Sequence, residues 1–297
     1  GNPAMVDIDL DGKLEINFDS IGSAGLFFRA DGTSYKWKIP GKTKKADKLV
    51  NIHFGAKSNT EDSPAYILIA SGSLGKIDRD GGVDFVKATA GFNFALTFAS
   101  GGKRADFDHH LSAWDTLNGK MLEGWPRVME DWQFFSNPAI VDINNDDDAE
   151  VIAASAGYLV HAWNFLGEEP KGFPKYTNGW VLASPGLGDI DGDGNWDIAV
   201  GSRDGYMFAW KTAGQREGSV NEWTWYGHDL HNTSNYHADI NPYADAQAQC
   251  RAGNKDDNKK EPEDDGCTAS PVSQGTGAML LLLALAAGVL ASRRRNA

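Results

Sequence analysis

The chain has 297 residues, enough for one large domain or two ordinary ones. Its formal net charge of −13 argues against nucleic-acid binding, which requires a basic surface. The 34 glycines and 10 tryptophans suit a fold of many short strands and tight turns. The two cysteines, Cys250 and Cys267, lie near the C-terminus, so the main fold is not a disulfide scaffold.

The N-terminus has no basic stretch followed by an apolar run, and therefore does not read as a signal peptide. Residues 1–5 lead directly into a repeated motif. We therefore expect an export signal and further repeats to precede Gly1.

Three segments of the chain repeat one pattern without a gap: residues 7–15, 142–150 and 189–197. Each carries oxygen-bearing side chains at positions 1, 3, 5 and 9, and each is followed by a short apolar run. A glycine follows 25 residues after the first aspartate in all three copies, after a run that contains aromatic residues. These marker glycines are Gly32, Gly167 and Gly214.

Two weaker copies lie between the first and second strong copies. One begins at residues 66–71 and leads to Gly81, and the other begins at residues 95–100 and leads to Gly119. Neither is expected to keep the acidic loop. The marker glycines are then 49, 38, 48 and 47 residues apart.

A period in the high forties with about four short strands per repeat is typical of a propeller blade. No segment before residue 240 shows a sustained helical period. The sequence therefore predicts an all-β propeller of four-stranded blades over residues 1–240. Five blades are visible, and the abrupt start predicts six or seven in the full protein.

The acidic loops have the composition of a site for a hard divalent cation. Calcium takes six to eight oxygen ligands in flexible geometry, whereas magnesium demands a stricter octahedron, so calcium is favoured. An EF-hand is excluded because position 12 is Phe18, Ala153 or Val200, within an expected strand, rather than glutamate. The alternative is that these acids only form solvated turns.

The three strong copies resemble the FG-GAP/VCBS repeats of integrin-like propellers, in which such a loop binds calcium. The Phe-Gly…Gly-Ala-Pro signature of that family is largely absent, so the resemblance concerns the calcium-binding blade alone. It implies three calcium ions, each held by four side chains and one main-chain carbonyl. The implied ligands are Asp7, Asp9, Asp11, Glu15 and the Lys13 carbonyl; Asp142, Asn144, Asp146, Glu150 and the Asp148 carbonyl; and Asp189, Asp191, Asp193, Asp197 and the Asn195 carbonyl.

Several histidines and tryptophans offer other chemistry. The pair His228 and Asp229 is expected to be structural, because similar segments close propellers of this type. Residues 106–110, Asp-Phe-Asp-His-His, have ligands that suit a transition metal, but a polar surface loop is the simpler interpretation. His53 and His161 lie on expected strands. Trp114, Trp163 and Trp210 recur at one repeat position, which favours core aromatics over a sugar-binding stripe.

The composition changes after Tyr243. Residues 241–276 read as a polar linker, and residues 277–297 as an apolar helix followed by three arginines. The order Gly-Cys, apolar helix and arginine cluster resembles the MYXO-CTERM sorting signal. That resemblance implies processing and lipid attachment at Cys267, with the helix removed. A permanent C-terminal membrane anchor is the alternative, and a Cys250–Cys267 disulfide would compete with processing.

Three functions remain in competition at this point. The first is a non-enzymatic, exported propeller at the bacterial cell surface that binds a protein or glycan, with a membrane contact through the tail before processing. The second is an accessory domain of a secreted hydrolase whose catalytic part precedes Gly1. The third is a propeller with its own metal-dependent activity at His109, His110 or His228.

Overall fold

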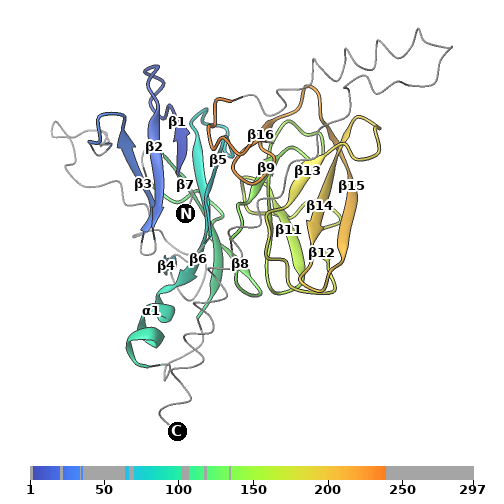
Figure 1. The fold of residues 1–297 in the computed structure, drawn as a ribbon, viewed down its shortest axis with the longest axis horizontal. Coiled ribbons are helices and arrows are strands. Elements are labelled where there is room, and N and C mark those ends of the chain that lie inside the picture. The colour runs from blue at the N-terminus through green and yellow to red at the C-terminus, as the bar shows by residue number, and fades with distance from the viewer. Residues whose placement is uncertain are drawn as a thin grey trace, which may run out of the picture. The chain divides into compact units, whose positions relative to one another are not determined.

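The structure is a computed structural model that describes residues 3–20, 23–33, 35, 64–66, 70–101, 107–116, 119–133, 135–229 and 231–238. These residues form an all-β fold of four antiparallel sheets. The sheets follow one another in chain order, from β1–β3 in blue to β13–β15 in yellow and orange, except that β16 returns to the third sheet (Figure 1). The all-β class expected from the sequence is therefore confirmed.

The first sheet has the order β1-β2-β3. Its strands are β1 (Ala4–Val6), β2 (Glu15–Ser20) and β3 (Ser23–Arg29). The second sheet has the order β4-β6-β7-β8, with β5 also paired to β6. Its strands are β4 (Pro64–Tyr66), β5 (Ser73–Gly75), β6 (Asp84–Gly91), β7 (His109–Asp115) and β8 (Arg127–Met129).

The third sheet has the order β12-β11-β10-β9-β16. Its strands are β9 (Ala139–Val141), β10 (Glu150–Ala154), β11 (Leu159–Trp163), β12 (Lys175–Tyr176) and β16 (Asn221–Trp223). The fourth sheet has the order β13-β14-β15. Its strands are β13 (Gly186–Gly188), β14 (Asn195–Gly201) and β15 (Met207–Gln215). The described sheets thus hold three or five strands rather than the expected four.

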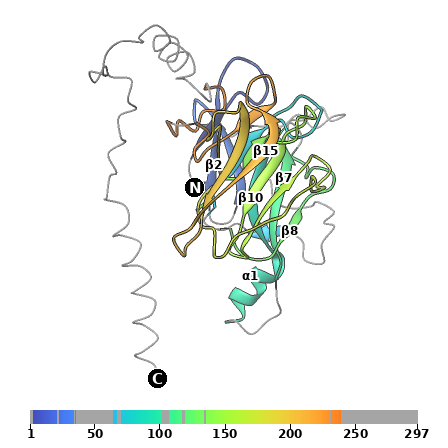
Figure 2. The ribbon, with the colours of Figure 1, turned by 90° about the vertical axis from the view of Figure 1, so that its right-hand side faces the viewer.

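The middle of the chain differs from the five-repeat prediction. Residues 95–100, expected to open a repeat with a strand, lie largely in the helix α1 (Phe92–Ala99), between β6 and β7. Both views show α1 projecting beyond one end of these strands (Figures 1 and 2). The sequence shows no sustained helical period before residue 240, and a single eight-residue helix is too short to display one, so α1 was not predicted. The two weak copies therefore share one sheet.

Two apolar cores run between the sheets. The first joins the first three sheets, where the rings of Phe27 and Phe85 meet edge to face at 5.9 Å and Trp114 stacks on Phe85 at 6.1 Å. The second lies between the third and fourth sheets and includes Ile152 and Ile198. The tryptophans Trp114 and Trp163 are each only 2% exposed, and Trp210 is partly buried against the second core. The prediction of core aromatics is confirmed for the first two.

After β15 the chain returns to strands β9, β5, β13 and β1 of the four sheets. We call residues 221–238 the central segment. It begins as β16 on β9 and ends beside β1, where Asn235 forms a parallel bridge with Met5. Between these points Thr224 accepts a hydrogen bond from Leu187 at 3.1 Å, and Glu222 accepts one from the Lys76 amide at 3.2 Å. The central segment thereby contacts all four sheets.

Candidate metal centres

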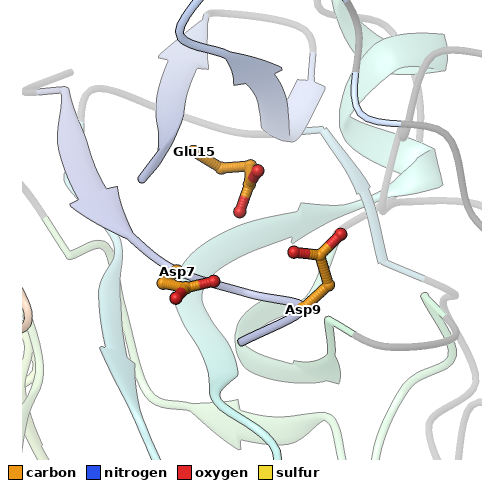
Figure 3. Close-up of side chains that lie close together, drawn as sticks. All are labelled: Asp7, Asp9 and Glu15. Carbon is orange, nitrogen blue, oxygen red and sulfur yellow. The ribbon is translucent and has the colours of Figure 1, made fainter. Parts of the chain in front are cut away.

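Loop 7–15 joins β1 to β2 and gathers three carboxylates at one point. Ligand oxygens of Asp7, Asp9 and Glu15 all lie within 4.8 Å of one another, and Figure 3 shows the three side chains converging. Asp7 accepts hydrogen bonds from the amides of Asp11 and Gly12, at 3.0 and 2.8 Å. Glu15 is buried, and one of its oxygens accepts the Ile8 amide at 3.0 Å. The turn therefore wraps around its own first and last acids.

Loop 189–197 joins β13 to β14 and repeats this arrangement. Ligand oxygens of Asp189, Asp191 and Asp197 again lie within 4.8 Å of one another. Asp189 accepts hydrogen bonds from Gly192 and Gly194, and Asp197 accepts the Ile190 amide at 2.9 Å. Positions 4 and 6 of the three predicted loops all have positive φ, which favours glycine and tolerates asparagine or aspartate. They are Leu10, Gly12, Asn145, Asp147, Gly192 and Gly194.

A basic side chain from the neighbouring strand lies beside each of these two carboxylate groups. The guanidinium of Arg29 on β3 lies 3.8 Å from Asp9. The ammonium of Lys211 on β15 contacts Asp191 and lies 3.1 Å from Asp193, which raises the lysine pKa. Both bases occupy the cross-strand position opposite the last acid of their loop. The two acidic groups therefore attract positive charge, as a cation site must.

Loop 142–150 joins β9 to β10 and has the same backbone pattern in a buried setting. The side chain of Asp142 accepts hydrogen bonds from the backbone amides of residues 144–147, at 2.6 to 3.4 Å. Glu150 accepts the Ile143 amide at 3.0 Å. Asp142 and Glu150 are fully buried, and burial raises the pKa of Glu150 to about 8. Among the described residues, three carboxylates lie within 4.8 Å of one another in loops 7–15 and 189–197 but not in loop 142–150.

Two polar contacts compensate the charge of loop 142–150. The Asn144 amide donates to Glu150 at 2.8 Å, which leaves the Asn144 carbonyl oxygen buried without a hydrogen bond. The guanidinium of Arg79 binds the side chain of Asp148, with Nε 2.8 Å from Oδ1. Arg79 also lies over the ring of Phe165 at 5.0 Å. A neighbouring loop thus supplies a fixed positive charge to this one.

A fourth loop of the same kind lies where the sequence analysis expected none. Residues 76–84 read Lys-Ile-Asp-Arg-Asp-Gly-Gly-Val-Asp and join β5 to β6. Asp84 accepts the Ile77 amide at 2.8 Å, seven residues earlier, as in the other three loops. Gly81 at φ 84° occupies loop position 6, equivalent to Gly12, and is therefore not a marker glycine. The pattern Ile-Asp-x-Asp-Gly would have revealed this loop had the register not been set from Gly81.

Loop 76–84 differs from the others in where its charges lie. Position 1 is Lys76, and the cross-strand residue opposite Asp84 is the acid Asp115, where the first and fourth sheets have a base. Burial raises the pKa of Asp84 to about 8, and its Oδ1 atom is buried without a hydrogen bond. Loop 76–84 therefore lacks two features of loops 7–15 and 189–197: the aspartate at position 1 and the basic residue opposite the last acid.

The residues present fit calcium best in loops 7–15 and 189–197. Their donors are all carboxylate or carbonyl oxygens, which a hard cation prefers, and three carboxylates already lie together in each. Side chains at positions 1, 3, 5 and 9 would hold the ion. In loop 142–150 the amide of Asn144 would first have to present its oxygen in place of its nitrogen.

The other predicted site residues are mostly buried and structural. His110 is only 1% exposed on β7, and His109 lies against Trp132 with ring centroids 4.2 Å apart, so the expectation of a polar surface loop is wrong. Asp106 and His53 lie outside the described residues. His228 and Asp229 are each 1% exposed, and Asp229 accepts the amides of His231 and Thr233. This geometry fits the structural interpretation of the pair.

His161 on β11 lies between two glutamates, an arrangement that sequence reasoning did not identify. Its two ring nitrogens meet Glu169 at 2.6 Å and Glu130 at 3.0 Å, and its ring stacks on Trp163 at 4.7 Å. Burial alone would lower the pKa of His161, but the two glutamates outweigh this and raise it. The His161 side chain therefore bridges the segment after β8 and the loop after β11. Glu130 lies 31 residues before His161, and nothing in the local sequence pairs residues this far apart.

The predicted tail, including Cys250, Cys267 and the apolar helix of residues 277–297, lies outside the described residues. Among the residues that the structure does describe, no helix is long and apolar enough to span a membrane.

No family model matches the chain, and no characterised protein matches it in sequence. Similar solved structures include the V. cholerae biofilm matrix protein Bap1, at 17% identity and TM-score 0.37, which covers 70% of this chain and 30% of that one. Another is BBS1N in complex with ARL6DN, at 11% identity and TM-score 0.37, with 75% and 57% covered. A third is the exotype rhamnogalacturonan lyase YesX, at 14% and 0.36, with 69% and 39% covered. The chain thus spans less than two thirds of each, and likenesses this weak carry no functional argument.

Proposed function

We propose that this protein is a calcium-stabilised β-propeller that acts by binding rather than by catalysis. The observation that carries the proposal is the convergence of three carboxylates, in the same register, in loops 7–15 and 189–197. A divalent cation relieves the repulsion among such carboxylates and favours their charged forms. If calcium binds the folded chain and not the unfolded chain, its binding free energy adds to the stability of the folded state.

Two features support a propeller as the arrangement of the four sheets. Each sheet contains one hairpin with an acidic loop in the same register, and the sheets follow the chain order. The central segment then connects the inner strands of all four, ending beside β1. In a propeller this region lies at the axis, where neighbouring blades meet. We propose that the four sheets are blades and that the central segment holds them together.

The proposal includes export and attachment to the bacterial surface through the tail, with processing at Cys267. The order of the linker, the Gly-Cys pair, the apolar run and the arginines supports it. Mass spectrometry of the protein from its native membrane tests this part, because a mature chain that ends beyond residue 277 would contradict processing near Cys267.

Calcium titration tests the metal proposal. Calcium at about 100 times its Kd stabilises the fold by about 2.7 kcal/mol per independent site, which raises the Tm by about 5–10 °C in a domain of this size. The double variant Asp9→Asn with Asp191→Asn should lose most of this response at both sites. Glu217→Gln, which neutralises an exposed acid outside the loops, serves as the matched control. A Tm that calcium does not change would contradict the proposal.

A further inference from the structure

All four described sheets repeat one cross-strand row of apolar residues. In each sheet the residue directly after the last loop acid pairs with an apolar residue on both neighbouring strands, so the three side chains lie together on one face. We call this the leading row of the sheet. The four leading rows are Met5–Ile16–Phe28, Leu74–Phe85–Trp114, Ile140–Val151–Trp163 and Leu187–Ile198–Trp210.

In the second, third and fourth sheets the leading row packs against the sheet that precedes it in the chain. The ring of Phe85 meets Phe27 of the first sheet at 5.9 Å. Val151 belongs to the core that the first three sheets share, and Ile198 to the core between the third and fourth sheets. The central residues of these three rows are therefore completely buried.

The leading row of the first sheet has the same chemistry but is open. Its central residue Ile16 is 38% exposed, and Phe18, next along the same face of β2, is 46% exposed. The equivalent residues of the third and fourth sheets are at most 2% exposed: Val151, Ala153, Ile198 and Val200. Contiguous exposed apolar residues mark an interaction surface, and here they occupy positions that a neighbouring sheet buries elsewhere.

The opposite face of each sheet carries a second row, which we call the trailing row. In the second and third sheets it is rich in small residues and at most 2% exposed, and in the fourth sheet Ala199 is half-buried and Ala209 exposed. Among the described sheets, neither apolar core joins the fourth to the first. The fourth sheet is therefore the one whose trailing row no described sheet covers. These three trailing rows are Ser73–Val86–Ala113, Ala139–Ile152–Ala162 and Gly186–Ala199–Ala209.

Two larger side chains flank the open trailing row. Met207 lies opposite Gly201, on the same face as Ala209, and is 75% exposed. The ring of Trp225 lies against Gly186 and is itself partly exposed. Methionine and aromatic residues are enriched at interfaces between proteins. The outer face of the fourth sheet thus has a flat centre of small residues with an anchor on either side.

We propose that the leading row of the first sheet binds the trailing row of the fourth sheet in a second copy of this chain. A large leading row against a small trailing row is the arrangement already present between the second and third sheets and between the third and fourth. The chain carries both halves of one further junction of this kind, on two sheets that no shared core joins. Each copy uses a different face, so the association is head-to-tail. The inference does not depend on calcium and goes beyond the proposed function.

Sedimentation velocity of the chain over a series of concentrations tests the proposal. The wild type should associate beyond a monomer. The double variant Ile16→Lys with Phe18→Lys blocks the leading row, and Ala209→Arg blocks the trailing row. Each should weaken association by at least about tenfold, because a charge would be buried against apolar side chains. Val128→Lys, which charges an exposed apolar residue of β8 outside both rows, is the matched control and should associate as the wild type does.

An equimolar mixture of the two blocked variants provides the decisive measurement. One variant keeps an intact trailing row and the other an intact leading row, so together they should form a heterodimer, which also shows that both are folded. A symmetric contact between two first sheets would not be restored by mixing, and association through the C-terminal tail would survive in both variants. A wild type that stays monomeric, blocked variants that associate as the wild type does, or a mixture that stays monomeric would each overturn the inference.

Discussion

Loops 142–150 and 189–197 follow one sequence pattern but balance their charge in different ways. In loop 189–197 Asp189 and Asp191 are partly or fully exposed and Asp197 is buried, the three carboxylates lie together, and the exposed Lys211 contacts Asp191. In loop 142–150 the first and last acids are fully buried, and the pKa of Glu150 is raised to about 8. There the side-chain amide of Asn144 donates a hydrogen bond to Glu150, and the guanidinium of Arg79 pairs with Asp148.

The difference shows that an acidic loop does not determine its own electrostatics. A carboxylate in water keeps its charge cheaply, whereas burial favours the neutral form unless a cation or donor lies next to it. The third sheet lies between two neighbours, and the fourth has one face of β15 exposed. Calcium would therefore displace a lysine from one loop and a proton from the other.

The largest expected difference between the loops is the cost of removing the first aspartate. Asp142→Ala removes the fully buried acceptor of four part-buried amide hydrogen bonds, so we expect a loss of about 3 kcal/mol. Asp189→Ala exposes its amides to water and should cost about 1 kcal/mol. Urea unfolding in a chelator measures both. Equal losses would show that burial does not separate the two loops.

The second prediction concerns the pH dependence of the calcium-free protein. Because the folded pKa of Glu150 lies above its ordinary value of 4.5, its contribution to stability is fully present below pH 4.5 and is lost as pH rises to about 8. We expect a fall on the order of 5 kcal/mol from this residue across that window. Glu150→Gln should flatten this part of the profile, while Asp84, shifted in the same direction, keeps its share.

Calcium should reverse this trend at neutral pH, because a bound cation favours the charged glutamate. Unfolding profiles of wild type and Glu150→Gln, each with calcium and with chelator, separate the proton from the metal. A wild-type profile in chelator that is flat between pH 5 and 8 would contradict the assigned burial effect.

His161 provides a third test, outside the loops but in the same sheet as loop 142–150. Its raised pKa means that the bridge to Glu130 and Glu169 is fully formed below pH 6.5 and is lost as pH rises through the folded pKa. His161→Gln should cost about 1–2 kcal/mol at pH 5.5, since both glutamates are partly exposed, and less at pH 9. Measured with saturating calcium, this change is separate from the loop titration. The same cost at both pH values would rule out a charged bridge.

The smallest expected effect concerns the two basic residues. Lys211→Gln removes a charge that competes with the ion and should tighten calcium binding at loop 189–197 a few-fold. Arg79→Gln should change calcium binding at loop 142–150 less, because Arg79 holds the side chain of Asp148 rather than a proposed side-chain ligand. Calorimetric titration of each variant measures the change. Weaker binding in Lys211→Gln would contradict the idea of a competing cation.

Local patterns predicted the three acidic hairpins well, because turn geometry depends mainly on neighbouring residues. Strands were expected at residues 16–18, 151–153 and 198–200, and each lies within β2, β10 or β14. The middle of the chain was predicted poorly because Gly81 was matched to the wrong landmark. A single glycine fits many turns, whereas the spacing from Ile77 to Asp84 identifies one.

The candidate sites were predictable only in part. The three carboxylates that converge in each of loops 7–15 and 189–197, at positions 1, 3 and 9, were among those predicted from spacing, whereas Asp11 and Asp193 at position 5 are not part of the converging groups. The Arg79–Asp148 and Glu130–His161 contacts join residues 69 and 31 positions apart in the chain, and no local pattern encodes such pairs.

The sequence by itself determined the repeated acidic hairpin, the all-β class and the type of ligand that each loop offers. These depend on side-chain chemistry and on turns of a few residues, which neighbours in the chain specify. Only the tertiary structure decided which acids are buried and which lie beside a base. Burial and long-range contacts set the energy of a charge, and both depend on how the sheets pack rather than on the loop that carries the charge.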